Sequence, residues 1–185
     1  MLNVNYSKMK KYLLSLVLLV AGIGCWAQDA EDLKSKVVII PHIGITCDIP
    51  ESASNLVMDK MKQVLLKNGI AEVTDRSRYV MTVKSNVTDA EWTETVPPKY
   101  AMTVELTFYV GDVLSGLLFS SKMFRRKAVA ENEEKAYLQA VKQIKVSDPE
   151  FKIMLDKAKA RIVESLDARD EPVELDGNGY NINWW

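Results

Sequence analysis

Strict alternation of apolar and polar side chains is the most regular pattern in the chain, and it is typical of strands that bury one face. It is clearest in residues 100–110, where every even-numbered position is apolar while Thr103, Glu105 and Thr107 occupy the other face. A similar pattern predicts four further strands, at residues 37–45, 70–74, 78–87 and 117–130. Because Pro41 has no amide hydrogen to donate, the first of these strands is expected at a sheet edge or a bulge.

Three other segments repeat their apolar positions every three to four residues, which predicts amphipathic helices at residues 48–69, 132–145 and 147–166. Two pairs of residues have the spacing of a capping box, Asp48 with Glu51 and Ser147 with Glu150. Gly69 suits the left-handed position that follows a helix end. With one apolar face per strand and one apolar stripe per helix, we predict an α+β fold. It is a two-layer sandwich of order β-α-β-β-β-β-α-α, with a mostly antiparallel sheet and helices on one face.

The amino-terminal segment has the organisation of a secretory leader. Three lysines precede an apolar run at residues 13–23, which is shorter than the roughly 20 residues that a helix needs to span a bilayer. We therefore interpret residues 1–27 as a signal peptide, with either Met1 or Met9 as its start.

Two processing routes compete at the end of this leader. Signal peptidase would cut after the small residue Ala27 and release a chain that starts at Gln28. A lipoprotein site would instead leave Cys25 as the lipidated first residue, although Gly22 stands where such sites prefer leucine and the bulky Trp26 follows. We favour release, so membrane attachment is expected only if Cys25 is lipidated. Both routes export the chain to the periplasm or the outer membrane.

The remainder divides into residues 28–35 as a linker, residues 36–167 as one domain and residues 168–185 as an acidic tail that ends in aromatics. Inside the domain, residues 88–99 are interpreted as a loop or a frayed strand end. The charges nearly balance, with 24 Lys+Arg against 25 Asp+Glu. The strongly basic composition typical of nucleic-acid binding is therefore absent, and we expect no nucleic-acid partner.

The sequence contains no recognisable catalytic pattern. His42 is the only histidine, and Cys47 has the opposite strand parity, so we expect neither a metal site nor a Cys–His pair. Cys47 is interpreted as a buried thiol. Glu105 and Asp112 are interpreted as a solvated strand residue and a turn former. We expect no catalytic, metal-binding or cofactor-binding residues and no cofactor. The alternative is a small exported hydrolase or ligand-binding protein that uses a pair of carboxylates not visible in the sequence.

One basic cluster lies in the last predicted strand. Lys122 and Arg126 share one face of that strand, and Arg125 and Lys127 share the other. Such a cluster suits an anionic partner, such as a lipid headgroup, lipopolysaccharide or an acidic protein patch. It also suits an edge strand whose charges prevent edge-to-edge aggregation.

The tail ends in Tyr180, Trp184 and Trp185. Exposed tryptophans at a terminus are unfavourable in water. The tail is therefore expected either to fold back onto its own domain or to dock onto a partner, for example as an added strand.

The order of elements and three local segments resemble a known group of proteins. The segments are "LLKNGIAEVTDRSRYVM", "VELTFYVGDVLSGLLFSS" and "NEEKAYLQAVKQI". They resemble exported Gram-negative, Bacteroidetes-type envelope domains of the curli-secretion lipoprotein and TolB amino-terminal type, and the lipoproteins that activate penicillin-binding proteins. The resemblance covers roughly residues 36–166. It implies a non-catalytic protein-binding or assembly module whose partners are envelope proteins. A further possibility is a subunit of a larger envelope assembly, which would form a homo-oligomer.

Overall fold

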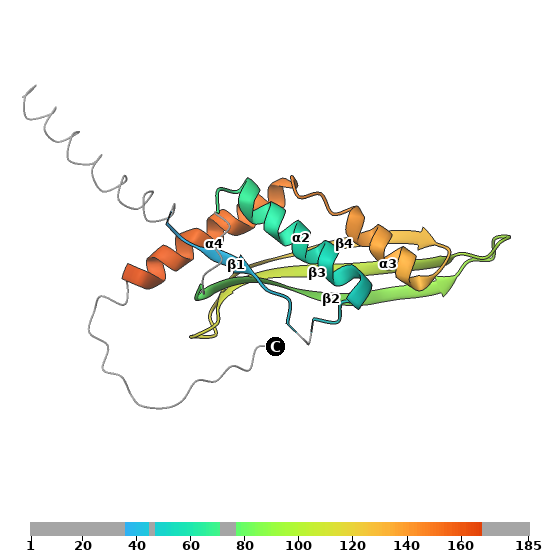
Figure 1. The fold of residues 1–185 in the computed structure, drawn as a ribbon, viewed down its shortest axis with the longest axis horizontal. Coiled ribbons are helices and arrows are strands. Elements are labelled where there is room, and N and C mark those ends of the chain that lie inside the picture. Colours follow the sequence, from blue (N-terminus) through green and yellow to red (C-terminus); the bar gives the residue numbers. More distant parts are fainter. Residues whose placement is uncertain (1–35, 45–46, 71–76, 168–185) are drawn as a thin grey trace, which may run out of the picture. The chain divides into compact units, whose positions relative to one another are not determined.

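The computed structural model describes residues 36–44, 47–70 and 77–167. These residues form a four-stranded sheet with helices packed on it (Figure 1). The strands are β1 (Ile39–Pro41), β2 (Tyr79–Trp92), β3 (Tyr100–Asp112) and β4 (Leu118–Ala130). The helices are α2 (Glu51–Lys67), α3 (Glu133–Lys142) and α4 (Pro149–Asp167). The predicted α+β fold and the order of these elements are confirmed. Most of the short strand predicted at residues 70–74 lies outside the described residues.

The sheet has the strand order β1-β2-β3-β4. β1 runs parallel to β2, whereas the other neighbours are antiparallel. Pro41 ends the short edge strand β1, as its missing amide hydrogen predicts. β2 continues past the predicted end at residue 87, because its pairing with β3 resumes after a bulge and reaches Trp92 opposite Tyr100. Of the segment 88–99, interpreted as a loop or a frayed strand end, residues 88–92 are therefore strand and residues 93–99 form the turn.

The core lies between the sheet and the helices. Five even-numbered side chains in the middle of β3 point into it, and each is at most 2% exposed: Met102, Val104, Leu106, Phe108 and Val110. An aromatic cluster joins the two layers, because Phe151 of α4 stacks on Phe124 of β4 at 4.5 Å between ring centroids and meets Phe108 edge-on at 5.1 Å. Burial of these rings is a main source of stability for the domain.

Two predicted capping boxes are wrong. Asp48 has a positive φ of 52° and lies two residues before the N-cap of α2, which is Pro50 and makes no side-chain capping bond. α4 begins one residue later than its predicted box requires. Asp148, rather than Ser147, precedes the helix, and its Oδ1 accepts a hydrogen bond from the Glu150 amide at 3.1 Å. The predicted stop of α2 is confirmed, since Gly69 adopts a φ of 72° directly after the cap residue.

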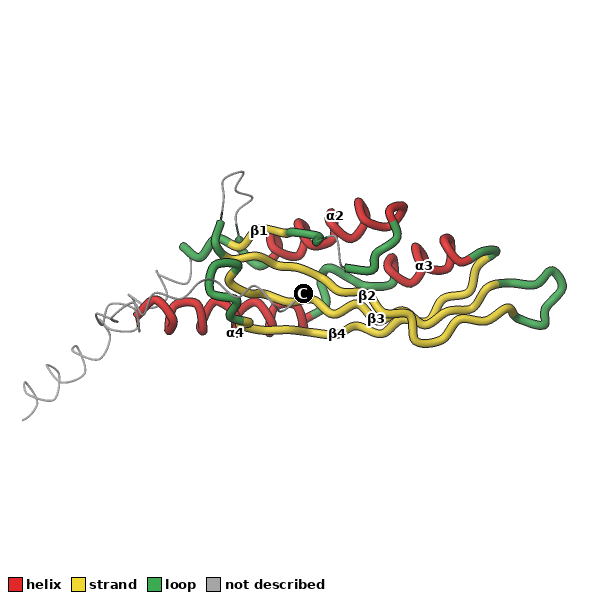
Figure 2. The backbone as a smooth tube through the Cα atoms, turned by 90° about the horizontal axis from the view of Figure 1, so that it is seen from below, coloured by secondary structure: helices red, strands yellow, loops and turns green. Residues whose placement is uncertain are grey.

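The sheet has two unlike faces. Figure 2 shows α2 and α3 on the same side of the strands, and the aromatic cluster places α4 on that side as well. Odd-numbered positions of β3 and β4, including Glu105, Arg125 and Lys127, occupy the other side, which we call the open face. The far ends of β2 and β3 and the turn between them project beyond α3 (Figures 1 and 2). In the described part of the chain, no helix combines the length and apolar character needed to cross a membrane.

Candidate functional site

His42 and Cys47 have different environments. His42 is exposed, and its backbone amide donates to the Met81 carbonyl at 2.9 Å. Cys47 is buried as predicted, and its Sγ accepts a hydrogen bond from the Gly44 amide at 3.1 Å and lies 3.9 Å from Thr82 Oγ1. Within the described ranges, no group of three or more His, Cys, Asp or Glu side chains is placed to hold a metal ion.

Asp112 is the one fully buried carboxylate among the residues that the structure describes. Its Oδ2 accepts hydrogen bonds from Arg78 Nε at 2.7 Å and Ser115 Oγ at 2.6 Å, and its Oδ1 accepts one from the Leu114 amide at 2.9 Å. Burial alone would raise the pKa of this carboxyl, but the hydrogen bonds from these three donors outweigh it and hold the pKa well below its usual range. Asp112 is the turn former predicted from the sequence, and both of its oxygens are used to shape that turn.

Glu105 lies in the middle of the open face. Its side chain is only 12% exposed, because Arg125 lies beside it on β4 and donates from Nε to Glu105 Oε1 at 2.7 Å. The interpretation of Glu105 as a solvated strand residue is therefore wrong. The carboxylate is neutralised by a cross-strand cation, an arrangement that stabilises neighbouring strands.

The basic cluster of β4 divides between the two faces, as strand parity predicts. Lys122 and Arg126 point toward α4, where they form ion pairs with Glu150 at 2.7 Å and Asp148 at 3.9 Å. These pairs connect the middle of β4 to the start of α4. The sequence does not predict this pairing, because both acids lie at the start of α4 and are separated from β4 along the chain by the whole of α3.

Arg125 and Lys127 are the cations of the open face. The Lys127 side chain is exposed and has no ion-pair partner among the described residues. The outer edge of β4 beside them is partly occupied, since Gln143 Nε2 donates to the Lys127 carbonyl at 2.9 Å and Arg161 donates to the Phe119 carbonyl at 2.8 Å. Such side-chain bonds, together with the cations, hinder the addition of another strand at this edge.

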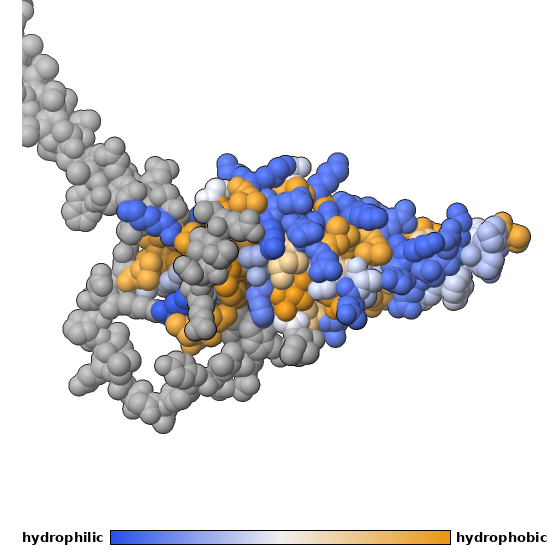
Figure 3. Space-filling model, viewed as in Figure 1, coloured by the Kyte–Doolittle hydropathy of each residue, from blue (hydrophilic) through white to orange (hydrophobic). Residues whose placement is uncertain are grey.

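The end of the β2–β3 hairpin presents apolar side chains to solvent. Trp92 is 59% exposed and packs edge-on against Tyr100 at 5.2 Å between ring centroids, and Val96 at the turn is 98% exposed. Figure 3 shows apolar atoms at the far end of this hairpin, beyond a band of hydrophilic residues. Sequence reasoning missed this surface. The available signal was Trp92, the one aromatic residue in the mostly polar stretch 88–95.

Hydrogen bonds connect the two sides of this turn. Thr93 donates its amide to the Lys99 carbonyl at 2.7 Å, and the Lys99 amide donates back to Thr93 Oγ1 at 2.9 Å. Thr95 Oγ1 donates to the Pro97 carbonyl at 3.0 Å. We call residues 92–100 the hairpin tip. Its apolar residues are therefore displayed on an ordered support.

A groove of about 510 Å³ lies between the outer side of α3 and the end of β4. Its walls carry Lys99, Lys135 and Lys142, and its apolar lining comes from Val129, Ala130 and Leu138. We call it the lysine groove. Asn132 fixes the start of α3 by accepting the Lys135 amide at 2.9 Å, and Lys60 of α2 fixes its end by donating to the Ile144 carbonyl at 2.6 Å.

A second groove, of about 460 Å³, lies between α3 and residues 48–52. Its charged side chains are acidic, whereas those of the lysine groove are mostly basic. Its lining includes Asp48, Glu133, Glu134 and Tyr137, and Tyr137 donates from its hydroxyl to Ser85 Oγ at 2.7 Å. The two grooves at α3 thus favour ligands of opposite charge.

The remaining candidates of the sequence analysis lie outside the described residues. They are Cys25 in the predicted leader and Tyr180, Trp184 and Trp185 in the tail. Their roles remain predictions.

Comparisons with known proteins yield structural likenesses alone. No family model and no curated protein matches the chain. Similar solved structures include a minor lipoprotein from Acinetobacter baumannii, with 15% identity, 71% of this chain and 93% of that chain covered, and a TM-score of 0.36. A PelC dodecamer from Paraburkholderia phytofirmans has 18% identity, coverage of 69% and 89%, and a TM-score of 0.38. A protein from Xanthomonas campestris has 16% identity, coverage of 71% and 86%, and a TM-score of 0.35. With identities and TM-scores this low, the likenesses carry no argument about function.

Proposed function

We propose that this chain is an exported, non-catalytic module that binds other envelope proteins. The observation that carries the proposal is the hairpin tip, where Trp92 and Val96 are exposed on a turn held by its own hydrogen bonds. Exposed apolar side chains that gather at one place on a surface are a common mark of protein contact sites.

The tip has the properties of a binding hot spot. Tryptophan is enriched among the residues that dominate binding energy, because it buries a large rigid ring. Since Tyr100 already supports the Trp92 ring and the turn is ordered, little conformational entropy remains to be lost on binding. The projection of the hairpin beyond α3 leaves room for a partner on several sides (Figure 1).

Other features support the same function. Arg125 and Lys127 on the open face offer cations to an acidic partner surface, and the ion-paired Lys122 and Arg126 hold the strand that carries them. Tyr180, Trp184 and Trp185 of the tail supply a further contact. The predicted leader, with Cys25 either removed or lipidated, and the resemblance to exported envelope domains support a location in the periplasm or at the outer membrane.

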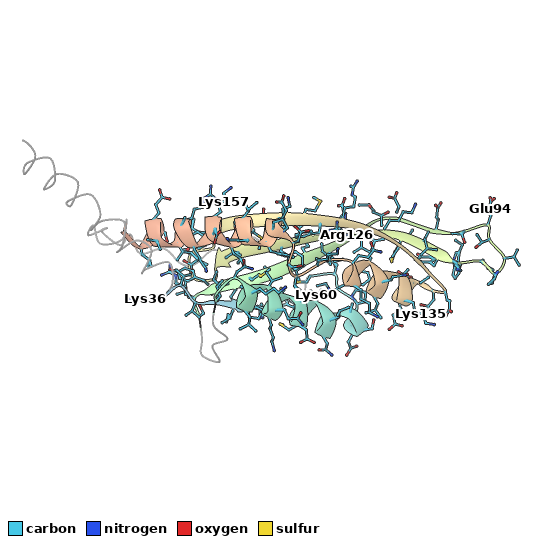
Figure 4. The ribbon with its side chains drawn as sticks, turned by 90° about the horizontal axis from the view of Figure 1, so that it is seen from above. Lys36, Lys60, Glu94, Arg126, Lys135 and Lys157 are labelled. Carbon is cyan, nitrogen blue, oxygen red and sulfur yellow. The ribbon has the colours of Figure 1, made fainter. Side chains whose placement is uncertain are left out.

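Site-specific photo-crosslinking in the native cell envelope tests this proposal. A photoreactive residue replaces Val96 at the tip, and in a matched variant it replaces the exposed Lys157 on α4, at a distant part of the domain (Figure 4). We expect a defined protein adduct from position 96 that position 157 does not give. Equal adducts from both positions, or none from position 96, would contradict the proposal.

A further inference from the structure

We propose that the lysine groove binds the acidic, aromatic tail, residues 170–185, of a second copy of this chain. The inference rests on the part of the proposed function that assigns the tail to a partner contact. The groove shares Lys99 with the hairpin tip but does not use Trp92 or Val96, the exposed apolar residues that carry the proposed function.

The charges of the groove and the tail are complementary. Lys99, Lys135 and Lys142 face one acid in the groove, Glu131, which forms an ion pair with Lys135. The tail carries four acidic residues and one arginine between residues 168 and 185: Arg169, Asp170, Glu171, Glu174 and Asp176. The groove at residues 48–52 bears acids of its own and would repel this segment, so the tail has one suitable site at α3.

The apolar parts also match. The groove lining includes Val129 and Leu138, which a charged peptide alone would leave uncovered. Its volume of about 510 Å³ lies within the roughly 300–1,000 Å³ typical of pockets that hold compact ligands. The aromatic residues Tyr180, Trp184 and Trp185 supply the apolar groups that such a lining would bury.

The position of the tail favours a second copy over the same chain. Arg161, near the end of α4, contacts the Phe119 carbonyl at the start of β4, whereas the groove lies at the other end of that strand, at Val129. A strand of 13 residues spans roughly 40 Å, at about 3.3 Å per residue.

To reach its own groove, the tail would therefore have to stretch about 12 residues along the domain, at most about 3.5 Å each. Few residues would remain to dock, and the stretched segment would lose much of its conformational freedom. A second copy placed end to end brings its groove to the tail directly. The contact is then heterologous, with the tail of one copy in the groove of the next.

A mixing experiment with two complementary variants tests this inference. One mature chain carries Lys99→Glu, Lys135→Glu and Lys142→Glu and keeps its tail. The other keeps its groove and lacks residues 170–185. Every residue of the hydrophobic core cluster lies between Val37 and Val163, so the deletion leaves the core intact, and circular dichroism checks the fold.

We expect each variant alone to be monomeric by size-exclusion chromatography with light scattering. Their mixture should form a 1:1 complex of twice the mass, because one intact tail meets one intact groove. The wild-type chain should associate further as its concentration rises, and added salt should weaken the association. A mixture that stays monomeric where the wild type associates, or a wild type that is monomeric at every concentration, would overturn the inference.

A matched control separates the groove from net charge. Lys67→Glu, Lys152→Glu and Lys157→Glu change the charge by the same amount at exposed positions away from the groove. A chain with this triple change should associate like the wild type. Loss of association in the control as well would show that overall charge, and not the groove, is responsible, and would also overturn the inference. The photo-crosslinking variants keep Lys99, and mass spectrometry of the adduct from position 96 distinguishes another envelope protein from a second copy of this chain. The two proposals therefore fail separately.

Discussion

Arg78 and Asp112 join the start of β2 to the end of β3, with Arg78 Nε donating to Asp112 Oδ2 at 2.7 Å. The Asp112 carboxyl is fully buried, while the arginine side chain remains 29% exposed. Both residues lie at the end of the sheet opposite the hairpin tip, so the pair contributes to the scaffold and not to the proposed contact site.

Replacement of this buried carboxylate should destabilise the domain strongly. We expect Asp112→Asn to lower the free energy of unfolding by about 3 kcal/mol, because a buried ion pair that loses one partner leaves the other uncompensated. Asp156→Asn, at an exposed position on α4, should change it by less than about 0.5 kcal/mol. Urea denaturation at neutral pH measures both. A cost for Asp112→Asn as small as that of the control would contradict the assigned role.

The same carboxylate predicts a pH dependence of stability. The hydrogen bonds to Asp112 hold its pKa in the folded chain below that of the unfolded chain, which is about 3.9. Its stabilising contribution is therefore complete above the unfolded pKa and is lost as the pH falls toward the lower folded pKa. The difference in unfolding free energy between the wild type and Asp112→Asn should be constant above about pH 5 and shrink below about pH 4. A difference that does not change with pH would show that the carboxylate charge is not responsible.

Tyr137 and Ser85 provide a test of the packing between α3 and the sheet. Burial raises the pKa of the tyrosine hydroxyl, which donates to Ser85 Oγ. Tyr137→Phe should cost about 1 kcal/mol, since it leaves the buried serine without that donor. Adding Ser85→Ala should recover part of the loss, as measured by a double-mutant cycle of denaturation curves. Independent, additive effects of the two changes would contradict the contact.

The position of α4 on the sheet can be tested through two of its apolar residues. Phe151 is buried between Phe108 and Phe124, whereas Ile153 is 61% exposed. Phe151→Ala should lower the free energy of unfolding by roughly 3–5 kcal/mol through loss of burial and creation of a cavity. Ile153→Ala should change it by less than about 0.5 kcal/mol. Similar effects of both changes in thermal or urea unfolding would show that α4 does not pack as described.

The mass of the mature chain depends on whether Cys25 is removed with the leader or kept and lipidated. Release by signal peptidase gives a chain that starts at Gln28, and lipid attachment gives one that starts at a modified Cys25. We expect intact mass spectrometry of protein purified from the native envelope to show the chain that starts at Gln28. A lipid adduct on Cys25 would replace release with membrane anchoring, and an intact leader would contradict export.

Much of the fold could be predicted because it depends on local patterns. The alternation in residues 100–110 identified the central strand, and the parity of Lys122 and Arg125 placed them on opposite faces. The helix starts were predicted less well. Asp48 and Ser147 are each followed by a glutamate three residues later, as a capping box requires. The helix start, however, is determined by backbone geometry that this spacing does not reveal.

The candidate surfaces depend on contacts between distant parts of the chain. Trp92 belongs to a strand because β3 pairs with it, and that pairing cannot be recognised from the polar sequence around it. The lysine groove combines Lys99, which precedes β3, with Lys135 and Lys142 on α3. Individually these are ordinary surface lysines, so the groove emerges only when α3 packs beside the end of β4.

The most direct test of the central claim uses the partner protein identified by crosslinking from position 96. Its affinity is measured for the wild-type chain and for the Trp92→Ala variant. The exposed Trp92 ring adds little to folding, so the variant should unfold within about 0.5 kcal/mol of the wild type. Loss of a tryptophan at the centre of a contact commonly costs about 2 kcal/mol or more in binding. We therefore predict a complex that is weaker by roughly thirtyfold or more. An unchanged affinity would contradict the assignment of the hairpin tip as the binding site.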